Sequence, residues 1–163
     1  MSTPEGISNA PLTELATAIH EYYRAQAKRE GWTLNFDQPF RELAPEIQAA
    51  SLASAVRIPE VLAVAGLRLL PPGAEAISLT EAQALACINE HLEAVAEAEH
   101  NGWMQQKLDD GWTCGERNDA RKSHPSLVPY ASLDQIEKDK DYSAVRAYPG
   151  VLLANGFGLA SSE

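Results

Sequence analysis

The chain has 163 residues, a formal net charge of −10 and a pI near 4.8. This length fits one compact domain, and the acidity argues against a nucleic-acid partner, because proteins that bind nucleic acid need a basic surface. No apolar run approaches the ~18 residues of a membrane span, and the N-terminus lacks an export signal. We therefore expect a soluble, cytoplasmic protein without a membrane partner, in which Cys87 and Cys114 stay reduced.

The elements predicted for the first half are mainly helical. Residues 1–10 are polar and small, which predicts a flexible tail. Apolar residues recur at helical spacing from Leu12 to Ala27 and predict a helix that ends near Gly31. Beyond it we expect a strand-like stretch at 32–36, a helix from about Pro45 to Val56 and a short helix from Pro59 to Ala65.

In the second half, the proline-containing segment 71–79 predicts a linker. Thr80 with Gln83 predicts a capping box that opens a long helix reaching about Asp110. The glutamates of this helix, Glu99 among them, should form a solvated face. Ser132 with Gln135 predicts another capping box and a helix toward Arg146, and Pro149 should open a last short helix that ends at Asn155.

Three blocks of the first half return in the second half. They are His20-x-x-Tyr23-x7-Gly31-Trp32-Thr33 with His100-x-x-Trp103-x7-Gly111-Trp112-Thr113, Pro39-Phe40-x-x-Leu43 with Pro129-Tyr130-x-x-Leu133, and Ser-Ala-Val-Arg at 54–57 with 143–146. Collinear matches of this kind predict two copies of one unit, a first, diverged repeat at 11–70 and a second at 80–160. We expect the copies to pack about a pseudo-twofold axis within a single domain, with a groove between them.

The second copy resembles a known family over roughly residues 95–158. The residues that carry the likeness are His100-Asn-Gly-Trp103, Gly111-Trp112-Thr-Cys-Gly115, Arg117, Asp119, Lys122, His124-Pro125-x-Leu127-x-Pro129-Tyr130 and Leu133. This pattern resembles the RyR domain, a repeat of ryanodine receptors that also occurs as stand-alone proteins of bacteria and phages. The resemblance implies a mainly α fold with a few short β-strands, built from two RyR-type repeats.

The resemblance also implies a cytosolic module without an established catalytic activity. In that family the cleft between the repeats looks suited to adenine-nucleotide-type ligands, and for a bacterial or phage relative it suggests a nucleotide-derived ligand. Such analogy does not establish function by itself.

Two histidine–aromatic pairs are the first candidate site residues. His20 with Tyr23, and His100 with Trp103, are three residues apart and share a helix face. Two such faces across a pseudo-twofold axis would stack a ring between Tyr23 and Trp103, with the histidines orienting it. The alternative is that both aromatics are core residues and both histidines satisfy buried backbone groups.

Cationic side chains complete the candidate site. The second copy carries an insert at 114–125 in which Arg117 and Lys122 would meet an anionic ligand group, with Lys107 one turn beyond Trp103. A solvated loop is the alternative for the insert. No spacing matches a metal site, a cofactor motif or a catalytic motif, so we expect no metal, no cofactor and no catalytic residue.

The sequence therefore predicts a non-enzymatic ligand-binding module, with a nucleotide or nucleotide-derived small molecule as its partner. Two other functions stay open at this point. One is a protein-interaction adaptor, because the same groove would accept a peptide. The other is a hydrolase or transferase that uses His20 and His100 as acid and base across the cleft.

Overall fold

The computed structural model describes residues 9–31, 37–74 and 76–162. Mainly helical, with a few short strands, it confirms the predicted fold class. In chain order the elements are α1 (Asn9–Glu30), η1 (Phe40–Glu42), α2 (Pro45–Val64), β1 (Leu67–Leu70), α3 (Glu81–Glu90), α4 (Leu92–Asp109), β2 (Thr113–Cys114), β3 (Ser123–His124), η2 (Tyr130–Ser132), α5 (Gln135–Ala154) and β4 (Gly158–Ser161).

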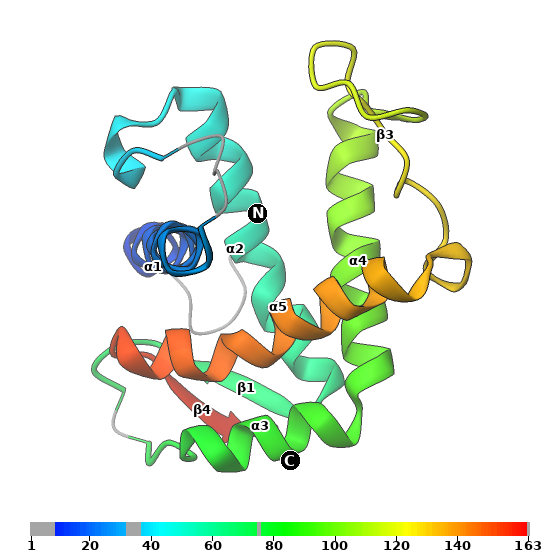
Figure 1. Cartoon of the computed structure of the whole chain (residues 1–163). Helices are drawn as coiled ribbons and strands as arrows, with labels where there is room; N and C mark the ends of the chain where they lie inside the picture. The colour runs from blue at the N-terminus through cyan, green and yellow to red at the C-terminus, as the bar shows by residue number, and fades with distance from the viewer. Residues whose placement is uncertain (1–8, 32–36, 75, 163) are drawn as a thin grey trace.

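Four long helices surround the region where the predicted repeats meet. Figure 1 shows α5 crossing in front of α2 and α4, with α1 beside α2 on the other side. The antiparallel pair of β1 and β4, together with α3, closes one end of the molecule, and the loop with the parallel pair of β2 and β3 lies at the far end of α4. The β1–β4 pair and the β2–β3 loop thus lie at opposite ends of the molecule.

The main core draws side chains from both predicted repeats. Leu15 of α1, Leu62 of α2, Ile88 of α3, Val95 of α4 and Leu152 of α5 are all fully buried in one cluster. Each such side chain stabilises the fold by about 1.5–3 kcal/mol when it is removed from water. The same cluster extends to the strands, so the two halves share one core.

The prolines do not end helices as predicted. Pro59 lies inside α2 and Pro149 lies inside α5, so each pair of predicted helices is one continuous helix. A proline removes one backbone hydrogen bond from a helix interior. Burial of the flanking side chains Ile58, Val61 and Leu62 in α2 offsets that loss, and the sequence pattern alone did not weigh it.

The helix ends bear out one predicted capping box and correct the other. Thr80 accepts a hydrogen bond from the Gln83 backbone N–H, and Gln83 bonds back to Thr80, as predicted. The prediction of one long helix from this capping box to about Asp110 is wrong, because His91 separates α3 from α4. The second capping box is also wrong, because Ser132 ends η2, and the N-cap of α5 is Asp134.

Some predictions for the ends and loops are also settled. The predicted flexible tail at 1–10 extends too far, because α1 begins at Asn9. Residues 1–8, and the strand-like stretch predicted at 32–36, lie outside the described residues. Strand β2 directly after Trp112 confirms the extended piece expected there. The strands β1 and β4 were not predicted; each follows a glycine with positive φ, Gly66 at 76° and Gly156 at 87°. Glycine is the residue that adopts this conformation without strain.

The two halves repeat the same local geometry. Pro39 and Pro129 have φ and ψ of −54° and 148° and of −55° and 147°, and each precedes a 3-10 turn and a 20-residue helix. In the antiparallel pair, Leu69 lies opposite Leu159. These likenesses support the duplication, while a twofold superposition of residues 12–69 on 97–159 stays a prediction.

The structure also corrects the register of the third repeated block. The helices α2 and α5 begin at Pro45 and Gln135, which aligns Arg57 with Ala147 rather than with Arg146. The exposure pattern agrees, because Ala55 and Val145 are both buried and Arg57 lies partly buried, whereas Arg146 is exposed. The shared Ser-Ala-Val-Arg string is therefore one residue out of register.

Candidate functional site

Both candidate histidines bind backbone carbonyl groups. The Nε2 atom of His20 lies 2.6 Å from the carbonyl oxygen of Gln38, and that of His100 lies 2.7 Å from the carbonyl oxygen of Val128. Each carbonyl directly precedes a proline and an aromatic residue that begins a 3-10 turn. The histidines therefore tie a helix to the following loop in the same way in each half. The contact of His100 is partly buried and that of His20 is exposed, so the alternative that both satisfy buried backbone groups fits His100 better than His20.

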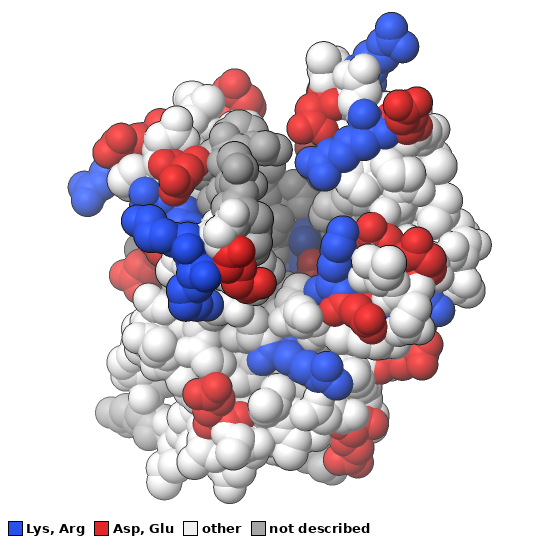
Figure 2. All heavy atoms as spheres, in the orientation of Figure 1, with Lys and Arg blue, Asp and Glu red and all other residues white. Residues whose placement is uncertain are grey.

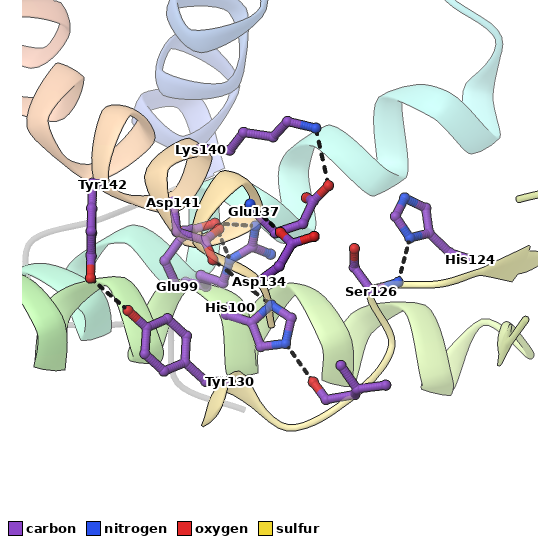
Figure 3. A network of polar contacts seen from close by, with 12 residues as sticks. Glu99, His100, His124, Ser126, Tyr130, Asp134, Glu137, Lys140, Asp141 and Tyr142 are labelled. Carbon is purple, nitrogen blue, oxygen red and sulfur yellow. Dashed lines mark hydrogen bonds and ion pairs between the residues drawn. The ribbon is translucent and has the colours of Figure 1, made fainter. Parts of the chain in front are cut away.

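The surroundings of His100 are more closed than those of His20. Its side chain is 3% exposed, its ring lies 5.7 Å from Trp103 and 6.2 Å from Tyr130, and its Nδ1 atom is 3.9 Å from Asp141. Burial raises the pKa of Asp141 to about 6, with the charge of His100 acting against this shift and Glu99 adding to it. Figure 3 shows Asp141 of α5 beside His100 and Glu99 of α4.

Trp103 packs on rings of its own half. Besides His100, its indole contacts His124, with the two ring centroids 5.1 Å apart and nearly perpendicular. Partly buried between these two imidazoles, Trp103 holds the insert against α4. Trp103 therefore packs against side chains of its own half, which is the alternative to ligand stacking that the sequence left open.

A buried ion pair that the sequence did not predict links three helices. Glu99 of α4, which is 7% exposed, accepts hydrogen bonds from Arg57 Nη2 at 2.9 Å and from the Tyr148 hydroxyl at 2.6 Å. Arg57 also donates to Gln106 at 3.0 Å. Burial and Glu99 both raise the pKa of Tyr148, so its hydroxyl stays protonated. The network joins α2, α4 and α5.

A glycine makes room for this ion pair. A Cβ atom on Gly102 would stand 2.3 Å from Cδ of Arg57, so the arginine reaches Glu99 across the bare backbone of α4. The solvated face predicted for Glu99 is wrong. The available signal was its spacing, because Val95, Glu99 and Trp103 are each four residues apart and share one helix face.

An inner cavity of about 230 Å³ lies beside the ion pair. Its lining comes from all four long helices: Ala16, Ile19, His20 and Tyr23 of α1, Ser51, Ser54, Ala55, Arg57 and Ile58 of α2, Glu99 of α4 and Tyr148 of α5. Burial, and then the charge of Glu99, raises the pKa of Tyr23 to about 12. The phenol of Tyr23 is therefore a neutral hydrogen-bond donor across the physiological pH range.

An outer groove of about 750 Å³ shares the lining residue Tyr23 with the inner cavity, and we refer to the two spaces together as the joined cavities. Its walls are Tyr22, Tyr23, Gln26 and Glu30 of α1, Arg117 of the insert, and Ile136, Asp139, Lys140, Ser143 and Ala144 of α5. The Arg117 side chain is 61% exposed, and its ion pair with Asp119 is loose at 3.4 Å. Figure 2 shows the molecule hollowed between the α1 lobe and the α4 lobe, with charges of both signs around the opening.

The two candidate lysines have other contacts. The Lys107 ammonium lies 4.4 Å from the ring centre of Trp112, and burial lowers the pKa of Lys107. Lys122, with a φ of 55°, donates to the carbonyl oxygen of Asp110 at the end of α4. The structure thus brings His20, Tyr23 and Arg117 to the two joined cavities, whereas Trp103, Lys107 and Lys122 line neither of them.

The model of the RyR domain family matches residues 75–161, which is more than half of the chain. The chain belongs to the RyR domain family. Glu99, Arg117 and Tyr148 lie inside the matched segment of this RyR protein, whereas His20, Tyr23 and Arg57 lie before it. The joined cavities are therefore built partly by the RyR segment and partly by the preceding half.

Two further properties of the RyR protein bear on its function. Within residues 9–31, 37–74 and 76–162, no three His, Cys, Asp or Glu side chains come together as metal ligands. By length and composition α2 could cross a membrane, a test that core helices of soluble proteins also pass. Four side chains of α2 are buried, and its Arg57 pairs with Glu99.

Proposed function

We propose that this RyR-family chain is a non-enzymatic module that binds a nucleotide or a nucleotide-derived small molecule in the joined cavities. The observation that carries the proposal is the position of Tyr23, whose side chain lines both the inner cavity and the outer groove. An aromatic side chain that lines both a smaller and a larger space suits a ligand with a flat ring and an extended polar part.

Size and charge support the same ligand class. Small-molecule sites usually enclose about 300–1,000 Å³, a range that contains the volume of the outer groove. Arg117 stands at that groove with a planar guanidinium, which can bind a phosphate group through two parallel hydrogen bonds. We infer that the ring lies against Tyr23 and the phosphate lies at Arg117.

A binding role is favoured over catalysis by the state of the histidines. Nε2 of His20 binds a backbone carbonyl, and His100 lines neither cavity, so the two histidines do not supply an acid and a base to one cavity. The cytoplasmic location and the bacterial or phage origin belong to this proposal through the family resemblance. A protein-interaction adaptor is the second candidate, favoured by Ile136, a large apolar side chain that is 70% exposed at the groove wall.

The test is a thermal-shift panel of nucleosides, nucleotides and cyclic nucleotides with chromatography of the same samples. We expect some nucleotides to raise the Tm, because a ligand that prefers the folded state stabilises it, and we expect none to be consumed. Arg117→Ala should reduce the shift for phosphorylated ligands, whereas Arg121→Ala, in the same exposed insert, should not. Turnover of a nucleotide would make the protein an enzyme. The absence of any shift, with a protein that co-purifies, would favour the adaptor.

A further inference from the structure

The inner cavity contains hydrogen-bonding groups that the fold itself does not use. In the described part of the chain the hydroxyls of Tyr23 and Ser51 make no hydrogen bond, and neither is sealed from solvent, since every fully buried polar side-chain atom there has a partner. Leaving such a hydroxyl without a partner beneath a bound ligand would cost about 1–3 kcal/mol. These two hydroxyls therefore favour a ligand that bonds to them.

The histidine in this cavity supplies the opposite kind of group. A carbonyl oxygen only accepts hydrogen bonds, so Nε2 of His20 must carry the hydrogen that binds Gln38. In the neutral ring Nδ1 is then an acceptor. The cavity thus offers an acceptor at His20 and donors at Tyr23 and Ser51, all within about 230 Å³.

Charge in the cavity is already balanced. Arg57 is already paired with Glu99, to which it donates hydrogen bonds of 2.9 Å from Nη2 and 3.3 Å from Nε. Its Nη1 atom donates to Gln106. A phosphate placed here would face the buried carboxylate of Glu99 with no free cation beside it, which is strongly unfavourable in a poorly solvated site. A neutral ring avoids this repulsion.

Resting on the proposed function, we infer that the inner cavity is a selectivity site for an uncharged heteroaromatic ring that carries a donor and an acceptor on one edge, as the nucleobases do. His20 Nδ1 accepts from the ring edge, the Tyr23 and Ser51 hydroxyls donate to it, and the charged part of the ligand stays in the outer groove. The ring of the ligand then lies in the inner cavity, and its phosphate lies in the outer groove.

The experiment is calorimetric titration of the full chain with the four common nucleosides, their 5′-monophosphates and inorganic phosphate. At least one nucleoside should bind, and phosphate alone should not compete with it. Tyr23→Phe and Ser51→Ala should each weaken that nucleoside by about two- to tenfold, the effect of one lost hydrogen bond. Thr17→Val removes a hydroxyl on the same helix as Tyr23 that lines neither the inner cavity nor the outer groove, and should leave the affinity unchanged.

The outcomes separate this inference from the function on which it rests. Binding of nucleotides that depends on Arg117 but is unchanged in Tyr23→Phe and Ser51→Ala would overturn the inner-cavity assignment and leave the proposed function standing. Competition by inorganic phosphate against the nucleoside would also overturn it. No binding of any nucleoside or nucleotide would overturn both.

Discussion

Each half contains a histidine that contacts a backbone carbonyl, but the side chains around this contact differ between the halves. In register, Tyr23 corresponds to Trp103, Ser51 to Asp141 and Ile58 to Tyr148. In the second set, Trp103 packs on His100, Asp141 lies near the same imidazole, and the Tyr148 hydroxyl donates to Glu99. The first set lines the inner cavity, as Tyr148 of the second set also does. The second half therefore buries its set against its own histidine and the Glu99 network, while both halves contribute to the lining of the proposed site.

The largest effect on this network should come from Glu99→Ala. The change leaves Arg57 buried without its carboxylate and Tyr148 without its acceptor. Removing one partner of a buried ion pair costs about 3–5 kcal/mol, and urea unfolding would measure it. Glu97→Ala, on the same helix but exposed, should change the free energy of unfolding by less than about 0.5 kcal/mol. A small loss in Glu99→Ala would show that the network does not support the halves.

Gly102→Ala should destabilise the protein by about 1–3 kcal/mol, because the new methyl group overlaps the Arg57 side chain. The sharper observation is a change of sign. In an Arg57→Ala background the overlap is gone, and alanine should stabilise α4 by up to about 1 kcal/mol through its helix propensity. Equal effects of Gly102→Ala in both backgrounds, measured by urea unfolding, would refute the close approach.

Asp141 should make stability fall as the pH rises. Burial raises its pKa from 3.8 to about 6 in the folded protein, so the folded state holds a proton that the unfolded state releases between those pH values. The free energy of unfolding should therefore decrease by roughly 1–2 kcal/mol from pH 4 to pH 6 on account of this group. Asp141→Asn should remove that part of the dependence. Asp139→Asn, exposed on the same helix, should leave it in place.

The smallest effect concerns the start of α5, where the two halves differ in capping. Asp134 accepts a hydrogen bond from the Glu137 backbone at 2.9 Å, whereas α2 begins after Ala44 without a side-chain cap. Asp134→Ala should cost about 1 kcal/mol, and Ser132→Ala, at the position first predicted to be the cap, should cost nothing measurable by thermal unfolding. The reverse order would restore Ser132 as the cap.

Local patterns predicted what local physics decides. The Thr80 capping box and the shared face of His20 and Tyr23 follow from spacing along one helix, and both are present. The ion pair of Arg57 with Glu99 joins residues 42 apart in the sequence, so no local pattern reports it. The continuation of α2 through Pro59 likewise depends on tertiary packing. Trp32, at which the first predicted extended piece begins, lies outside the described residues.

The comparison of the halves is tested most directly by titrating Tyr23→Ala and Trp103→Ala with the nucleotide that binds the wild type best, at a temperature where both variants are folded. The account predicts that Tyr23→Ala weakens binding by roughly ten- to a hundredfold, the effect of losing one stacked ring. Trp103→Ala should lower the Tm and leave the affinity within about twofold. Loss of affinity in Trp103→Ala with none in Tyr23→Ala would contradict the account and place the ligand in the other half.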